Sequence, residues 1–86
     1  MKDAVWSTEA VGDFVRIQRA DPRAAGRIYQ SVVQFLRDDT GDIKKLEGPD
    51  QQWRIRVGDW RTIFAYDDPT GRMRIVQVVN RRDAYR

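Results

Sequence analysis

The chain has 86 residues, enough for a single small domain over residues 1–86 with one hydrophobic core. It contains no histidine and no cysteine, which excludes disulfide bonds, zinc sites built from these ligands, and catalysis by a serine–histidine or cysteine–histidine pair. The net charge of +3 is uneven, because residues 1–50 carry 8 Lys and Arg against 9 Asp and Glu, whereas residues 51–86 carry 8 Arg against 4 Asp. This asymmetry favours a polyanionic partner, most often nucleic acid.

No stretch of the sequence has the composition of a signal peptide or a membrane span. The first residues lack an apolar run, and no run of about 18 apolar residues occurs elsewhere. We therefore expect a cytoplasmic protein that makes no membrane contact. No metal ion or other cofactor is expected.

The first half of the chain predicts a short strand at residues 4–6 and then two helices. Ser7 is a suitable N-cap, and apolar residues recur at helical spacing until the first helix ends near Arg19. Asp21 and Pro22 mark the start of the second helix, because aspartate caps helices and proline favours the first helical position. The expected buried stripe of this helix is Ala25, Ile28, Tyr29, Val32, Phe35 and Leu36, and residues 38–41 end it. The very short link predicts an antiparallel helical hairpin.

The second half predicts three consecutive strands, preceded by a brief extended stretch at residues 43–46 and a turn at 48–50. Apolar residues at 53, 55 and 57 alternate with arginines at 54 and 56, as in a half-buried strand. Gly58-Asp59 suits a two-residue type II′ turn, so Val57 should pair with Trp60 and Arg56 should face Arg61. A loop at 67–71, a strand at 72–80 and a short tail at 81–86 follow.

This order predicts an α+β fold in which an N-terminal two-helix hairpin packs on one face of a small antiparallel β-sheet. With the loop at 67–71, Tyr66 would pair with Arg72, and Arg61 would pair with Gln77. The open face of the sheet would then carry Arg54, Arg56, Arg61, Gln77, Val79 and Arg81. In this register Arg81 lies beside Arg61.

The arginines of the open face favour an anion-binding site. Arg56 and Arg61 repel each other across the ladder by a few tenths of a kcal/mol, and an anion between them would relieve this repulsion. Guanidinium groups bind phosphate in a bidentate manner and stabilise charge in a transition state, but they do not take up a proton. Tyr85 in the tail could transfer a proton or stack on a base, since nearby positive charge favours its phenolate. The alternatives are a solvated arginine face and a tyrosine that packs the tail onto the domain.

Three segments resemble the RelE/ParE toxin family. They are Leu46-Glu47-Gly48, residues 53–64 and residues 79–86. The family pattern is a leucine-x-glycine, a basic strand ending in Arg-Val-Gly-(Asp)-aromatic-Arg, and a closing Arg-Arg-acidic-x-Tyr. The similarity covers residues 43–86, and over residues 1–42 it depends on the two-helix layout.

The resemblance implies a RelE-like fold and the toxin of a type II toxin–antitoxin system. Members resembling RelE are ribosome-dependent endoribonucleases that cleave mRNA in the A site and inhibit translation. The ribose 2′-hydroxyl attacks the adjacent phosphate without a metal, leaving a cyclic phosphate and a 5′-hydroxyl. The implied partners are the ribosome, mRNA, a cognate antitoxin protein, and operator DNA, which only the toxin–antitoxin complex binds.

The same motifs give the candidate site residues. Arg61, Arg81 and Tyr85 match the catalytic positions, and Lys44, Lys45, Arg54, Arg56 and Arg82 are the candidate RNA- and phosphate-binding residues. The chain departs from the family at Asn80, where many relatives have histidine or lysine, and at the two strand arginines, where lysine is frequent. These departures leave Tyr85 as the only proton-exchanging group of the catalytic set, so we expect a slow nuclease. Lys44 and Lys45 are reserve proton donors.

Two other functions stay open at the level of sequence. A ParE-like member would inhibit DNA gyrase through protein contacts and would lack the nuclease residues. The combination of Tyr85 with Arg61 and Arg81 favours the nuclease over this alternative. The third candidate is a module that only binds nucleic acid.

Overall fold

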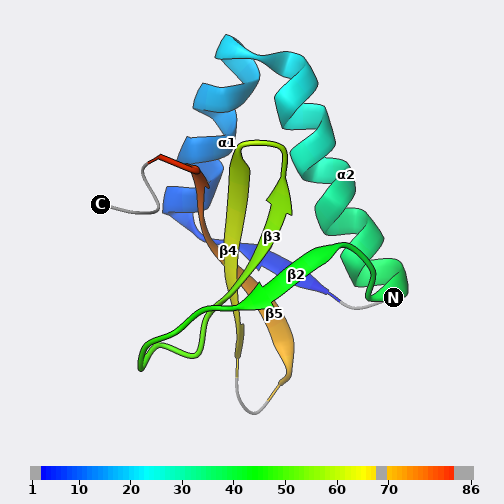
Figure 1. Ribbon diagram of the computed structural model, residues 1–86, viewed down its shortest axis with the longest axis vertical. Helices are drawn as coiled ribbons and strands as arrows, with labels where there is room; N and C mark the ends of the chain where they lie inside the picture. The colour runs from blue at the N-terminus through cyan, green and yellow to red at the C-terminus, as the bar shows by residue number, and fades with distance from the viewer. Residues whose placement is uncertain (1–2, 68–69, 83–86) are drawn as a thin grey trace.

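Two helices and five strands form a two-layer α+β fold in the computed structural model, which describes residues 3–67 and 70–82. The elements follow in the order β1 (Ala4–Trp6), α1 (Thr8–Ala20), α2 (Pro22–Asp38), β2 (Asp42–Lys45), β3 (Trp53–Val57), β4 (Trp60–Asp67) and β5 (Arg72–Asn80). The strands form one sheet in the order β1-β5-β4-β3-β2. Helices α1 and α2 run side by side as a hairpin against this sheet (Figure 1). The predicted α+β architecture with an N-terminal helical hairpin is confirmed.

The helix ends are fixed by the capping residues that the sequence predicts. The Ser7 side chain accepts a hydrogen bond from the Ala10 amide at 3.0 Å, which caps α1. The Asp21 carboxylate accepts one from the Ala24 amide at 3.1 Å, and Pro22 begins α2. Helix α2 ends at Asp38 and is capped by Asp39, which adopts the left-handed conformation with a φ of 57°.

The core lies between the helices and one face of the sheet, in two clusters. The first comprises Ala10, Val32, Phe35, Ile55, Phe64, Met73 and Ile75. The second comprises Ile17, Ala24, Ala25, Ile28 and Val78. Burying each of the larger side chains contributes about 1.5–3 kcal/mol. The prediction for Tyr29 was wrong, because this residue lies at the border of the buried stripe and is 53% exposed.

The hairpin formed by β3 and β4 has the predicted register. Val57 pairs with Trp60, and Arg56 pairs with Arg61. Gly58 has a φ of 56°, while Asp59 stays outside the positive-φ region, as a type II′ turn requires. The turn residues and the alternation of β3 therefore fix this part of the sheet locally.

The register predicted between β4 and β5 was wrong. Tyr66 pairs with Met73 and Arg61 pairs with Val79, because β4 continues one residue further into the loop, to Asp67, and β5 contains one extra residue, Val76, as a bulge. Either change alone would reverse the face on which the side chains of β5 lie. Together they restore it, so Gln77 and Val79 do share the face of Arg61.

The sheet is mixed, whereas the sequence predicted an antiparallel one. Strand β1 runs parallel to β5, with Ala4 opposite Met73 and Trp6 opposite Ile75. This pairing brings together residues from opposite ends of the chain, so no turn sequence between neighbouring strands predicts it. Neither of the two described helices is long and apolar enough to cross a membrane.

Candidate active site

The sheet face opposite the helices carries most of the candidate phosphate-binding residues in two cross-strand rows. Ile55 of β3 is 1% exposed in the core, so its neighbours Arg54 and Arg56 lie on the other face. From β2 to β5, the first row is Asp42, Arg56, Arg61 and Val79, and the second row is Lys44, Arg54, Ile63 and Gln77. Because adjacent strands lie about 4.8 Å apart, this arrangement gathers four cations on three neighbouring strands. We call this surface the cationic face.

The opposed pair of Arg56 and Arg61 is the centre of the cationic face. The two residues follow the pair that closes the two-residue turn, which makes them a non-hydrogen-bonded pair with Cα atoms about 4.5 Å apart. Arg56 is exposed, and its Nε contacts the Gly58 carbonyl oxygen at 3.5 Å. Arg61 is half-buried. Two like charges forced together on an open surface favour an anion that both can contact.

Arg54 has a different environment from Arg56, although both lie on the same face of β3. Arg54 is 8% exposed, and its Nη1 donates to the Asp42 carbonyl oxygen at 2.8 Å and to the Asp42 carboxylate at 3.1 Å. This ion pair joins β2 to β3 beside the opposed arginines. The sequence analysis missed Asp42. The signal that could have revealed it is the alternation of Asp42 and Lys44 on a strand that begins one residue earlier than predicted.

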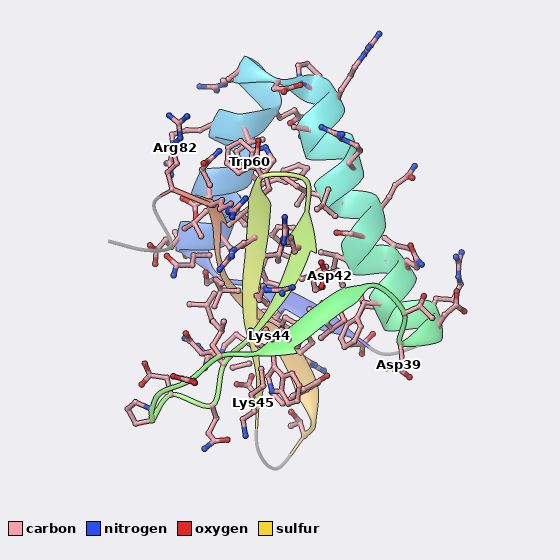
Figure 2. The ribbon with its side chains drawn as sticks, in the orientation of Figure 1. Asp39, Asp42, Lys44, Lys45, Trp60 and Arg82 are labelled. Carbon is pink, nitrogen blue, oxygen red and sulfur yellow. The ribbon has the colours of Figure 1, made fainter. Side chains whose placement is uncertain are left out.

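The two candidate lysines lie on opposite faces of the sheet. Lys44 is exposed and pairs with Arg54, which places it on the cationic face. Lys45 pairs with Trp53, and its Nζ lies 5.8 Å from the centre of that ring, as in a cation–π contact. Figure 2 shows Asp42, Lys44 and Lys45 following one another along β2. The structure therefore brings Lys44, and not Lys45, to the arginines.

The closing motif begins beside the hairpin turn. The Arg81 amide donates to the Asp59 carbonyl oxygen at 2.6 Å, which holds this backbone next to the start of β4. Arg82 is exposed, and its amide donates to the Asn80 side chain at 3.1 Å. Figure 2 shows Arg82 at the end of the sheet where Trp60 lies. Tyr85 lies outside the described residues.

The arrangement can bind a phosphate and stabilise negative charge that develops on it. Arginine keeps its proton at every working pH, so the cationic face offers charge and hydrogen-bond donors. Over residues 3–67 and 70–82, no group of three or more Asp or Glu side chains is placed to hold a metal ion. Asp42, the carboxylate of the first row, pairs with Arg54.

Known proteins match this chain in structure and not in sequence. No family model matches it, and no curated protein matches it significantly. A YoeB/ParE toxin from Agrobacterium tumefaciens is 23% identical, with a TM-score of 0.74 over 93% of this chain and 98% of that one. The RelB–RelE antitoxin–toxin complex from Methanococcus jannaschii is 19% identical, with a TM-score of 0.72 over 94% of each chain. A YafQ variant from E. coli is 12% identical, with a TM-score of 0.77 over the full length of both chains. These similarities show that the chain has the RelE-like toxin fold.

Proposed function

We propose that this protein is the toxin of a type II toxin–antitoxin system and that it is an endoribonuclease. Its substrate is mRNA in the ribosomal A site, so cleavage stops translation. The shared fold supports the toxin role. The observation that carries the nuclease assignment is the opposed pair of Arg56 and Arg61 on an open sheet face, with Lys44 in the neighbouring row.

The proposed reaction is a transesterification within the RNA. The ribose 2′-hydroxyl loses its proton and attacks the adjacent phosphorus, and the bond from phosphorus to the 5′-oxygen breaks. The leaving oxygen takes up a proton, which yields a cyclic phosphate and a 5′-hydroxyl. Arg56 and Arg61 hold the non-bridging oxygens and stabilise the additional negative charge of the transition state, and Arg81 contributes a further positive charge to this stabilisation. The motif assigns the proton transfer to Tyr85, and Lys44 is the alternative proton donor.

The proposed partners follow from the same role. One similar structure is an antitoxin–toxin complex, which supports a cognate antitoxin for this chain. Operator DNA would be bound by the toxin–antitoxin complex only. An activity on translating ribosomes requires the protein to act in the cytoplasm.

Induced expression in growing bacteria, followed by primer extension on abundant mRNAs, tests the proposal. We expect growth arrest together with new 5′ ends inside translated messages. A matched message without a start codon should stay intact, because the cleavage requires translation. Arrest with intact mRNA and gyrase-linked DNA breaks would establish the ParE-like alternative instead. RNA binding with neither growth arrest nor mRNA cleavage would support the third candidate, a module that only binds nucleic acid.

The Arg61→Ala variant is the matched control for this experiment, and we expect it to lose toxicity while it stays folded. Arg61 lies on the cationic face and outside the two core clusters. Removing one of two facing like charges relieves repulsion in the ladder, which offsets the lost packing of a half-buried side chain. Circular dichroism checks the fold and colony counts check toxicity. An unfolded variant would show that Arg61 is structural and that the site is misplaced.

A further inference from the structure

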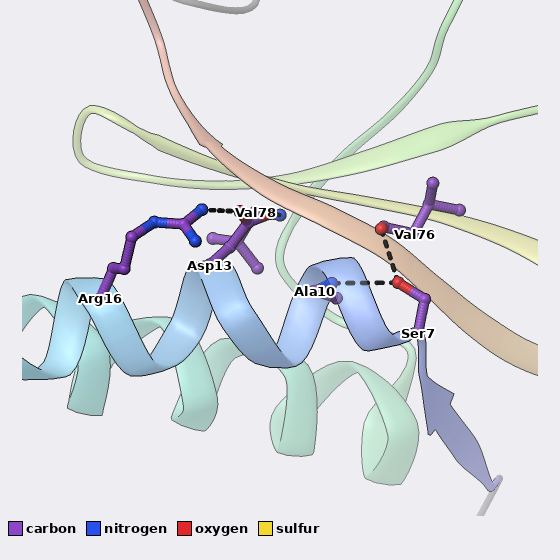
Figure 3. Close-up of polar contacts among 6 residues, drawn as sticks. All are labelled: Ser7, Ala10, Asp13, Arg16, Val76 and Val78. Carbon is purple, nitrogen blue, oxygen red and sulfur yellow. Dashed lines mark hydrogen bonds and ion pairs between the residues drawn. The ribbon is translucent and has the colours of Figure 1, made fainter.

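The outer edge of β5 changes its partner halfway along the strand. Strand β1 pairs with β5 from Met73 to Ile75, and the Ser7 amide donates to the Ile75 carbonyl oxygen at 2.9 Å where this ladder ends. Beyond that point, within the described part of the chain, α1 lies beside β5 instead of a strand (Figure 3). The backbone groups of this edge therefore need partners from a helix.

Two side chains meet this need, one from Ser7, the N-cap of α1, and one from Asp13 within α1. The Ser7 hydroxyl donates to the Val76 carbonyl oxygen at 2.7 Å, and the Asp13 carboxylate accepts from the Val78 amide at 2.9 Å. Figure 3 shows Ser7 at the start of α1 and Asp13 further along the helix, both reaching β5. They occupy the place that a continued β1 would have, Ser7 at the bulge residue Val76 and Asp13 two residues beyond it.

The Asp13 contact costs more free energy than the Ser7 contact, because it buries a charged side chain. The residue is 8% exposed, and its second carboxylate oxygen pairs with Arg16 one turn further along α1. The Arg16 side chain is itself 72% exposed, so it compensates the charge from the solvent side. A buried carboxylate with both oxygens engaged holds its backbone partner in a defined place.

The segment that Asp13 holds is the one that completes the cationic face. Val79 follows Val78 and pairs with Arg61, and Asn80 pairs with Trp60. The next residue is Arg81, whose amide bonds to the Asp59 carbonyl oxygen in the hairpin turn. The position of the Arg81 backbone relative to Arg61 thus depends on where the end of β5 lies against β4.

From this geometry we propose that Asp13 is a positioning residue of the nuclease. Through its bond to the Val78 amide it fixes the end of β5, and with it the placement of Arg81 against Arg61 and Arg56. The inference depends on the proposed function, because it assigns Asp13 a part in that reaction. A displacement of catalytic groups by about 1 Å can lower a rate by about 10²-fold. Asp13 acts from α1 and does not touch the RNA.

The first test is the single-turnover rate of mRNA cleavage in a reconstituted translation assay. In Asp13→Ala we expect the rate to fall by about tenfold to 100-fold, with unchanged affinity for the ribosome. Asp13→Asn keeps an acceptor for the Val78 amide and should keep most of the rate. Arg16→Ala removes the ion pair alone and is the control. A wild-type rate in Asp13→Ala, or an equal loss in a folded Asp13→Asn, overturns the proposal.

Asp13→Ser is the second variant if Asp13→Ala fails to fold, because its shorter side chain leaves the Val78 amide to a water molecule. The same loss of rate is expected. If neither variant folds, Asp13 is a folding determinant only and the positioning role is overturned.

Amide signals in two-dimensional NMR separate this inference from the proposed function. In Asp13→Ala the signals of Val78, Val79, Arg81 and Arg61 should move, while those of α2 stay in place. This result would support the positioning role even for a protein that cleaves no mRNA. Unmoved signals at Val79 and Arg81 would overturn it even for an active nuclease.

Discussion

Two arginines on one face of one strand have different environments because their neighbours differ. Arg54 is buried under the end of β2 and bonds to both the backbone and the carboxylate of Asp42. Arg56, two residues on, is exposed beside the hairpin turn. The sequence pattern places both on one face, but it cannot show that a carboxylate twelve residues earlier pairs with only one of them. We infer that Arg54 supports the cationic face and that Arg56 contacts the RNA.

Arg54→Ala should lower the free energy of unfolding by about 2 kcal/mol. A hydrogen bond to a charged group contributes about 1.5–3 kcal/mol, and the buried stem adds packing. Arg56→Ala is the matched control and should change stability by no more than about 0.5 kcal/mol, as an exposed residue does. Urea denaturation followed by circular dichroism measures both. Equal stabilities of the two variants would contradict the different roles.

Tyr85→Phe should slow mRNA cleavage by at least about tenfold in a reconstituted translation assay, since general acid–base catalysis contributes about 10²–10⁴-fold. The chain has no histidine, and its strand positions carry arginine, so the tyrosine hydroxyl is the proposed proton-transfer group. Phenylalanine keeps stacking and packing. A normal rate in Tyr85→Phe with a loss only in Tyr85→Ala would make Tyr85 a stacking platform. The proton transfers would then pass to Lys44, the ribosome or water.

Among the elements, those fixed by neighbouring residues were predictable. The caps at Ser7 and Asp21 and the hairpin over 53–66 depend on a few adjacent side chains and one turn. The bulge at Val76 and the parallel pairing of β1 depend on contacts between distant parts of the chain. The sequence therefore identified the opposed arginines, while the position of Lys45 and the contribution of α1 required the structure.

The hairpin turn gives a prediction at this scale. Gly58→Ala should destabilise the protein by about 1 kcal/mol, because the φ of 56° disfavours a residue with a Cβ atom. No atom within 4 Å would meet the added Cβ, so the cost is conformational. Gly26→Ala, at an exposed position of α2, has equally open surroundings and should stabilise the protein by about 0.5–1 kcal/mol. The unfolding temperatures of the two variants should therefore shift in opposite directions from that of the unchanged protein. Equal shifts would contradict the argument.

For the whole molecule, the charge separation along the sequence becomes a separation in space. Residues 51–86 supply β3, β4 and β5, and their arginines on β3 and β4 gather on the face that the helices leave open. Several acidic side chains of residues 1–50 are engaged in helix caps and ion pairs, among them Asp21, Asp13 and Asp42. The net charge of +3 therefore understates the positive potential of the cationic face.

Salt dependence tests whether this face binds RNA. Each neutralised phosphate of a single strand contributes a slope of about −0.7 to the logarithm of the binding constant against the logarithm of salt concentration. Contacts from Lys44, Arg56 and Arg61 should give a slope of about −2, and Lys44→Ala should make it less steep by about 0.7. Lys45→Ala is the matched control, since Lys45 lies on the other face beside Trp53 and should leave the slope unchanged. Fluorescence anisotropy with a labelled RNA oligonucleotide measures all three proteins. Equal reductions in the two lysine variants would mean that RNA passes over the edge of β2 and not along the cationic face.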